Sequence, residues 1–419
     1  MNHRERVLTS LSHKQPDKIA FDFGGTCCTT MHVSCIEKLR DYYGLEKRPV
    51  TVVDVFTMVG MIDEDLADAL GVDLSPAYPI GASFGLKRNK VKEWKNPQGQ
   101  ILLVPSEFNP ESDGKGGLYV RPNNDPSLPV TGHMPEKSFY FDAVLRQDTY
   151  DEDEIKPTDN LMEWQLLGED DLSYIKEQAE NGRRQDRAVV FGAPGMGLGD
   201  AADIPGVGLK NPKGIRNYTD WYTAPLLMED YVKEVFDRQM NIALENLRRV
   251  NDTCGDLIDV VFTCAADLSH QHSLFVSPET YKECYLPYYK KVNDWIHKNT
   301  NWKILKHNCG AVRPLIPLLI ESGFDALNPV QTSADGMDPA RLKDDFGNDI
   351  TFWGGGIDTQ EILPFGTPEQ VRQQVLERCE IFGNNGGFVF NTVHDVQANT
   401  PLENLVALID AVKEFNGDK

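Results

Sequence analysis

The chain has 419 residues, 40% of them hydrophobic and 25% charged, a composition that can bury a large core in one or two domains. With 64 acidic and 42 basic side chains the formal net charge is -22, so most of the surface repels a nucleic-acid backbone. No signal-type apolar segment opens the chain, and no apolar run is long enough to span a membrane. We therefore expect a cytoplasmic protein with neither a nucleic-acid nor a membrane partner.

The first 150 residues contain one βα-like unit and an insertion. A helix near 5–11, a strand near 19–23 and a helix near 34–43 predict a βα unit in which a barrel begins. Residues 85–145 include an Asn-Pro-Gln-Gly turn between the segments 91–94 and 101–104, which predicts a β-hairpin insertion. Residues 148–186 are polar and acidic, and we expect a solvated helix and surface connector there.

From about residue 186 onward, short β-rich runs alternate with amphipathic stretches, a pattern typical of successive βα units around a parallel sheet. Each run is short and bounded by Gly, Pro, Asp or Asn, as expected for strands buried on both faces. The predicted strands are 188–191, 257–263, 302–305, 326–327, 350–353 and 388–390. One elaborated domain over 1–419 fits this pattern better than two. The glycine-rich stretch 195–200 is followed by prolines rather than a helix, so we interpret it as a lid loop and not a dinucleotide site.

Polar side chains follow five consecutive predicted strands. Because the carboxyl ends of parallel strands share one mouth, these side chains should converge there. They are Cys264 with Asp267, His307 with Cys309, Asn328 with Gln331, Asp358, and Asn391 with His394.

A metal is the chemistry that this convergence favours. Catalytic zinc takes three nitrogen, sulfur or oxygen ligands and keeps one position open. His307 and Cys309 supply two ligands from one turn, and His394 is the best third because it also follows a strand. Asp395, Cys264 and Asp267 are the reserve ligands. Each residue also has a structural alternative. His307 and His394 could be hydrogen-bonded histidines at helix starts, and Asp267 could be a capping or loop carboxylate. A turn around Pro329 could account for Asn328 and Gln331.

The eight cysteines are thinly spread, so reduced thiols are favoured over a disulfide framework, and most should be small core residues. Cys27 and Cys28, with His32 nearby, form a rival metal cluster. No second pair of the CxxC type supports this cluster, and packed thiols are the preferred interpretation.

The motifs together resemble the uroporphyrinogen decarboxylase superfamily, and within it the corrinoid-dependent methyltransferases. The match covers residues 250–415 well and the first half loosely. It runs through Asp-Leu-Ser-His-Gln at 267–271, Ser-Pro-Glu at 277–279, His-Asn-Cys-Gly at 307–310, 323–328, 354–358, 386–388 and 400–405. The resemblance implies a (β/α)8 TIM barrel, here with the hairpin insertion and extra N-terminal helical segments.

Two subfamilies are separated by the loop after the first strand. The decarboxylases carry an Arg-Gln-Ala-Gly-Arg loop whose arginines hold substrate carboxylates, whereas residues 23–30 here contain no arginine. Porphyrin decarboxylation is therefore disfavoured. The methyltransferases hold zinc with His-x-Cys and a distant cysteine, and the position of that cysteine is His394 in this chain. A neutral imidazole there leaves zinc one charge unit more positive, which suits a methoxy compound or an alcohol as substrate.

The resemblance thus implies a zinc-dependent methyltransferase that moves a methyl group between a small methylated substrate and a corrinoid. His307, Cys309 and His394 would hold zinc, Asp267 and Asp358 would be catalytic, and the substrate would meet Asn328, Gln331, Gln271 and Asn391. No Asp-x-His-x-x-Gly segment is present, so a separate protein should carry the cobalamin. The alternatives are a metal-independent decarboxylase of a smaller acid and a non-catalytic ligand-binding barrel. The methyl donor and acceptor, the direction of transfer and the oligomeric state stay open, with a homodimer as one option.

Overall fold

The computed structural model describes residues 1–147, 149–152, 154–193, 197, 199 and 203–418. At its centre lies one sheet of parallel strands in the order β1-β17-β16-β15-β14-β13-β12-β5. Their bounds are β1 (Ala20–Phe21), β5 (Leu74–Ala77), β12 (Ala188–Gly192), β13 (Val260–Cys264), β14 (Lys303–His307), β15 (Ala326–Asn328), β16 (Thr351–Trp353) and β17 (Phe388–Phe390).

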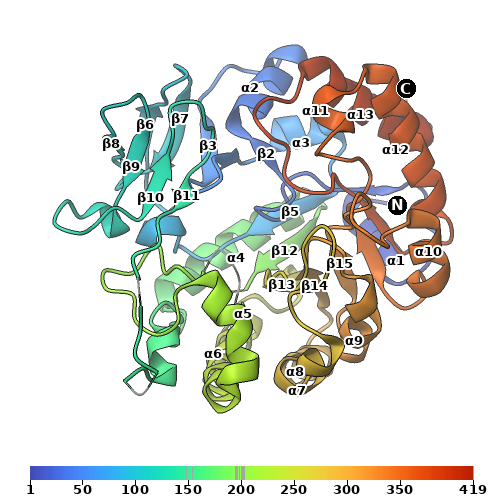
Figure 1. The fold of residues 1–419 in the computed structure, drawn as a ribbon. Coiled ribbons are helices and arrows are strands. Elements are labelled where there is room, and N and C mark those ends of the chain that lie inside the picture. The colour runs from blue at the N-terminus through green and yellow to red at the C-terminus, as the bar shows by residue number, and fades with distance from the viewer. Residues whose placement is uncertain (148, 153, 194–196, 198, 200–202, 419) are drawn as a thin grey trace.

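The two outermost strands of this sheet meet and close it. The backbone N–H of Asp73, just before β5, donates to the carbonyl oxygen of Phe21 in β1 at 2.8 Å. Figure 1 shows the resulting barrel with helices around it. The predicted (β/α)8 barrel is thereby confirmed.

The N-terminal helix α1 (His3–Leu11) closes the end of the barrel opposite the mouth. Val7 and Leu11 join the apolar cluster inside the barrel, which includes Leu74, Val190, Leu305, Trp353 and Val389. Ser10 accepts a hydrogen bond from the N–H of Gly387, which lies just before β17. The amino ends of the strands are therefore covered, and only their carboxyl ends are left for a site.

The remaining helices connect the strands and surround the barrel. They are α2 (Val33–Tyr42), α3 (Glu64–Leu70), α4 (Glu169–Arg184), α5 (Tyr218–Leu227), α6 (Glu229–Cys254), α7 (Pro278–Cys284), α8 (Leu286–Asn299), α9 (Ile316–Glu321), α10 (Pro339–Phe346), α11 (Ile362–Phe365), α12 (Pro368–Gly383) and α13 (Leu402–Phe415). Short 3-10 helices lie at Ser83–Gly85, Pro122–Asn124, Pro157–Leu161, Gly255–Leu257 and Arg313–Leu315.

Part of the acidic segment 148–186 packs on the barrel. It contains helix α4, whose residues Leu172, Ile175 and Ala179 are buried where the helix packs on β5 and β12. The many acidic residues of α4 made the segment look solvated in the sequence. An apolar residue at every third or fourth position is nevertheless enough to bury one side of a helix.

The insertion is larger than a hairpin. The expected hairpin is present, with β6 (Val91–Lys95) antiparallel to β7 (Ile101–Pro105). It extends a sheet that also holds β2 (Met31–His32), β3 (Val50–Asp54) and β4 (Val59–Gly60). A second sheet is made of β8 (Glu111–Ser112), β9 (Leu118–Val120), β10 (Gly132–Met134) and β11 (Asp142–Ala143). Both lie to one side of the barrel in Figure 1.

Strand β5 was not predicted from the sequence. It reads Leu-Ser-Pro-Ala, and a proline within a strand usually argues against one because it removes a ladder donor. Here Pro76 pairs in register with Val190 of β12. Among the described residues, no helix combines the length and the apolar character that crossing a membrane requires.

Candidate metal centre at the barrel mouth

The ligand-bearing side chains converge at the mouth from distant parts of the sequence. His307 ends β14, Cys309 follows two residues later, and His394 lies in the loop after β17. The possible ligand atoms form two overlapping groups, each with its members within 4.8 Å of one another. One group is Asp267, His307 and Cys309, and the other is Cys28, His307 and His394. His307 belongs to both and is the centre of the cluster.

A neighbouring amide fixes the ring of His307. Nδ2 of Asn328 donates to the carbonyl oxygen of Trp353 at 3.0 Å, so its Oδ1 faces the imidazole. His307 Nδ1 lies 2.8 Å from that Oδ1 and therefore carries the proton. Nε2 is left with its lone pair, 3.3 Å from Cys309 Sγ, which is the arrangement that a metal-binding histidine needs.

The Cys309 turn is held by backbone contacts. The N–H of Cys309 donates to Asp267 Oδ1 at 2.7 Å, and the N–H of Gly310 donates to Gln331 Oε1 at 2.8 Å. Gly310 has φ +89°, and a Cβ there would lie 2.5 Å from the carbonyl oxygen of His270. The turn after Cys309 therefore requires glycine.

His394 faces His307 at the same mouth. The two ring centroids are 5.4 Å apart, and the ring planes are nearly perpendicular. His394 Nδ1 pairs with Asp395 Oδ1, and the imidazole also forms a hydrogen bond with the thiol of Cys309. Asp395, expected as a reserve ligand, is thus a partner of the histidine.

The charges of the cluster are coupled. Burial lowers the pKa of His307, but the thiolate of Cys309 and the carboxylate of Asp267 outweigh burial and leave the pKa raised. Burial raises the pKa of Cys309, yet the neighbouring imidazoles leave it lowered. For His394 burial is again outweighed, here by Asp395, and its pKa lies well above the ordinary value. The mouth therefore stabilises a thiolate, the form of cysteine that binds metals.

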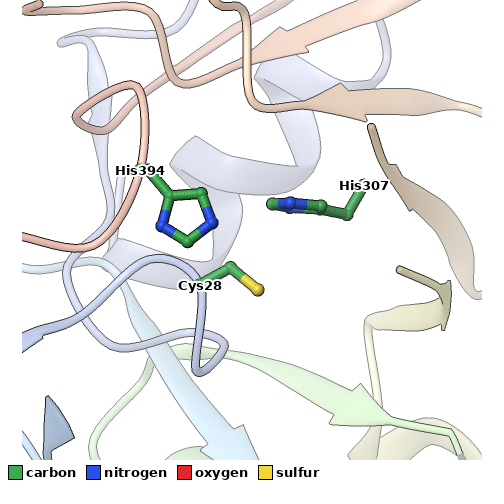
Figure 2. A group of neighbouring side chains, drawn as sticks. All are labelled: Cys28, His307 and His394. Carbon is green, nitrogen blue, oxygen red and sulfur yellow. The ribbon is translucent and has the colours of Figure 1, made fainter. Parts of the chain in front are cut away.

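Cys28 lies in this cluster although the sequence analysis favoured a packed thiol. Its sulfur lies within 4.8 Å of a nitrogen of each imidazole, and Figure 2 shows Cys28 beside the two rings. His32, its suggested partner, instead contacts Ser34 and the carbonyl oxygen of Phe139. All eight cysteines are free thiols, and the packed interpretation holds for Cys35, Cys254, Cys264, Cys284 and Cys379, which are buried.

The other residues predicted at the mouth contact protein groups. Gln331 Nε2 donates to Gln271 Oε1 at 2.6 Å, and Gln271 Nε2 donates to the carbonyl oxygen of Ser333. Asp358 Oδ1 accepts the N–H of Gln360 at 2.7 Å. Asn391 donates to two carbonyl oxygens of the loop after β1, and the reserve ligand Cys264 lies in the core beside Tyr289. The lid expected at 195–200 falls largely outside the described residues.

An arginine from the insertion also reaches this region, and the sequence analysis missed it. The Arg88 guanidinium lies over the ring of Tyr78, which follows β5, at 4.9 Å from the ring centroid. The pKa of Cys27 is lowered, first by its hydrogen bond with Cys28 and further by Arg88 and His307. A lone arginine in a predicted hairpin carries no signal that could place it there.

A pocket of about 750 Å³ lies next to the group of possible metal ligands. Its lining includes Tyr222, whose hydroxyl donates to the carbonyl oxygen of Asp267 at 2.6 Å, and Ala311, two residues after Cys309. Phe275 stacks on Tyr222 in the same wall. The pocket thus shares loops with the cluster, while its lining contains none of the predicted site residues.

Comparison with known proteins matches the second half of the chain to a known family. Residues 213–415 match the uroporphyrinogen decarboxylase (URO-D) family. These residues are a URO-D family domain. The domain spans the strands that carry Asp267, His307, Cys309 and His394, and the resemblance inferred from the sequence is confirmed.

Curated relatives of the URO-D domain carry two kinds of name. The chain is 34% identical over 149 residues to a methylated-thiol–coenzyme M methyltransferase from Methanosarcina mazei, covering 36% of each chain. It is 23% identical over 264 residues to a uroporphyrinogen decarboxylase from Pseudoalteromonas translucida, covering 59% of this chain and 65% of the relative. The chain thus matches about a third of the length of the methyltransferase and just under two thirds of the length of the decarboxylase.

A solved structure shares the fold over the whole length. It is a methyltransferase from Methanosarcina mazei, with a TM-score of 0.54, 14% sequence identity and 99% of both chains covered. The URO-D domain and the first half of the chain thus form one known architecture.

Proposed function

We propose that this protein is a zinc-dependent methyltransferase that moves a methyl group between a small methylated molecule and a corrinoid held by a partner protein. The observation that carries the proposal is a pair of overlapping ligand groups at the mouth of a URO-D barrel, which share His307 and divide the predicted ligands Cys309 and His394 between them. The similarity to a relative named a methyltransferase supports it.

The residues at the mouth fit zinc. Imidazole nitrogen and thiolate sulfur are the ligands that zinc prefers, and Asn328 and Asp395 each bind one nitrogen of an imidazole whose ring also contacts Cys309. The lowered pKa of Cys309 provides the thiolate. A bound zinc would polarise the heteroatom that carries the methyl group and stabilise its charge as the methyl group leaves.

Asp267 is the proposed acid–base residue. Its carboxylate lies within 4.8 Å of the ligand atoms of His307 and Cys309, and its other contact, with the N–H of Cys309, fixes its direction. It can therefore take or give a proton at a heteroatom beside these ligands. Asp358 stays a predicted catalytic residue, although its contact with the N–H of Gln360 also accounts for it as a turn residue.

The β1 loop separates the proposal from decarboxylation of an acidic tetrapyrrole. In residues 23–30 the side chains are apolar, hydroxyl or thiol groups, so the loop offers no cation to pair with substrate carboxylates. We place the corrinoid on a separate protein because the chain contains no Asp-x-His-x-x-Gly segment.

The first test is metal analysis combined with a methyl-transfer assay. We expect the purified protein to bind one zinc per chain and to demethylate methylcobalamin in the presence of an acceptor, and we expect His307→Ala to lose both properties. His133→Ala is the matched control, because that histidine lies in β10 of the insertion, where it pairs with Asp113 outside the cluster. Zinc that survives the loss of His307, or decarboxylation without metal and corrinoid, would contradict the proposal.

A further inference from the structure

We propose that Cys28 is a fourth protein ligand of the zinc, so that two imidazoles and two thiolates hold the metal before substrate binds. The inference rests on the proposed zinc site and goes beyond its predicted ligands His307, Cys309 and His394. Its basis is that the Cys28 sulfur and one nitrogen from each imidazole lie within 4.8 Å of one another. Figure 2 shows the three side chains approaching from three separate segments.

The loop that carries Cys28 is built to hold its position. Its ends are joined because the N–H of Gly24 donates to the carbonyl oxygen of Thr29 at 3.0 Å. Inside the loop, the N–H of Cys28 donates to Thr26 Oγ1 at 3.2 Å. The N–H of Gly25 donates to the buried carboxylate of Asp22 at 2.8 Å. These bonds leave the Cys28 backbone little freedom, as a preorganised ligand requires.

Asn391 ties this loop to the strand that leads to His394. Its Nδ2 donates to the carbonyl oxygens of Asp22 at 2.7 Å and Thr29 at 3.0 Å, on both sides of Cys28. Asn391 itself directly follows β17, three residues before His394. The distance between the Cys28 thiol and the His394 imidazole is therefore set by buried hydrogen bonds.

Cys27, the adjacent thiol, has different surroundings. The two sulfur atoms are 3.9 Å apart. Cys27 lies near Asp54, Arg88 and His307, whereas Cys28 lies near Asp395 and Cys309, and of the two only Cys28 belongs to a group of possible ligands within 4.8 Å of one another. The geometry thus selects one cysteine of the pair and leaves the other as a matched control.

The second thiolate changes the charge of the proposed site. His394 replaces a thiolate with a neutral imidazole, and Cys28 would return that negative charge once zinc displaces its proton, because its hydrogen bond with Cys27 and burial otherwise hold its pKa well above the ordinary value. Two thiolates offset both positive charges of zinc, so the preference for an oxygen- or nitrogen-bound methyl group, argued from one thiolate, no longer follows. Four protein ligands also close the coordination sphere, so an incoming substrate must displace a ligand or expand the site.

The test counts sulfur ligands in the full-length protein without substrate. Zinc K-edge X-ray absorption should give two sulfur atoms in the wild type and one in Cys28→Ser, with two retained in Cys27→Ser. The Co²⁺-substituted proteins should show the same pattern in their sulfur-to-cobalt charge-transfer bands. Zinc affinity should fall in Cys28→Ser by more than the about 10- to 100-fold that loss of a ligand's hydrogen-bond partner causes. Cys28→Asp, which keeps a ligand at this position, should recover part of that affinity.

The outcomes separate this inference from the proposed function. One sulfur ligand in the wild type, or an equal loss in both single variants, would overturn the role of Cys28 and leave the zinc site standing. Loss of sulfur in Cys27→Ser alone would also overturn it. Protein that binds no zinc at all would overturn the proposed function together with this inference. Circular dichroism of each variant confirms that the fold is retained.

Discussion

His307 Nδ1 and Asn328 Oδ1 lie 2.8 Å apart across two neighbouring strands. The two residues are paired in register, since β14 and β15 place them opposite each other at their carboxyl ends. Asn328 cannot turn its amide around, because its Nδ2 donates to the carbonyl oxygen of Trp353. The sheet itself therefore decides which nitrogen of His307 faces the mouth.

Asn328→Ala should weaken zinc binding by about 10- to 100-fold, because His307 loses the acceptor that fixes its ring and tautomer. Competition with a chromophoric chelator measures the affinity. Asn328→Asp is the control, since it keeps an acceptor for His307 and should lose less affinity than the alanine variant. An alanine variant with wild-type affinity would show that Asn328 does not orient the ligand.

Asn391→Ala should destabilise the protein by roughly 2 to 5 kcal/mol, because two buried carbonyl oxygens lose their donor. Urea denaturation gives the free energy of unfolding. Asn391→Asp should be no more stable than the alanine variant, since a carboxylate has no hydrogen to donate to the carbonyl oxygens of Asp22 and Thr29. If both variants stay within about 0.5 kcal/mol of the wild type, as surface substitutions do, the anchoring role of Asn391 is wrong.

Asp22 should make stability depend on pH. Burial raises the pKa of its carboxyl group from 3.8 to about 6, although hydrogen bonds from Gly25 and Trp353 oppose this. The folded protein thus binds this proton more tightly than the unfolded chain, and the stabilisation is lost as pH rises through about 6. The shift corresponds to ~3 kcal/mol.

Asp22→Asn removes this titration. Relative to the wild type, the variant should therefore gain about 3 kcal/mol of stability between pH 4 and pH 7, whatever its absolute stability. Denaturation curves of both proteins at several pH values measure the difference. A constant difference across this range would show that Asp22 does not titrate as described.

Gly310→Ala should cost roughly 1 to 3 kcal/mol and lower zinc occupancy, since a methyl group would collide with the carbonyl oxygen of His270 and a positive φ disfavours it. Thermal unfolding and metal analysis measure the two effects. Gly336→Ala is a matched control: it has φ +75° but open space around it, so it should show the backbone cost without the loss of zinc. Equal zinc occupancy in both variants would contradict the role of Gly310.

The strand-end rule located much of the site from sequence because it needs only the order of strands. It brought His307, Cys309, His394 and Asp267 to one mouth. The rule could not predict whether an amide side chain at the mouth faces the substrate or another protein group. Asn328 and Asn391 both hydrogen-bond to protein groups. The group that each amide faces depends on the rotation of its side chain, and the periodicity of the sequence does not encode that rotation.

The place of Cys28 beside His307 and His394, and strand β5, were not predicted, for different physical reasons; Cys28 was weighed only in a rival cluster with His32. Cys28 lies in the loop after β1, and only closure of the barrel brings β1 beside β17. Its chemistry is therefore visible only after the tertiary fold is known. Strand β5 is short and contains a proline, so its local preference opposes the structure that its neighbours β12 and β1 impose.

If the methylated substrate carries a carboxylate, Arg88→Gln should raise its KM by about tenfold or more, because a charge-assisted hydrogen bond contributes roughly 1.5 to 3 kcal/mol. Arg88 lies over Tyr78 at the end of β5 and adds positive charge near Cys27, so it is the cation that would pair with such a group. Arg88→Lys should recover only part of the effect, since an ammonium group keeps the charge and loses the flat stacking on Tyr78. Steady-state kinetics with a methylated acid and its uncharged amide separate recognition of charge by Arg88 from its effect on the shape of the mouth. An equal rise in KM for the acid and the amide would mean that Arg88 shapes the mouth without recognising charge.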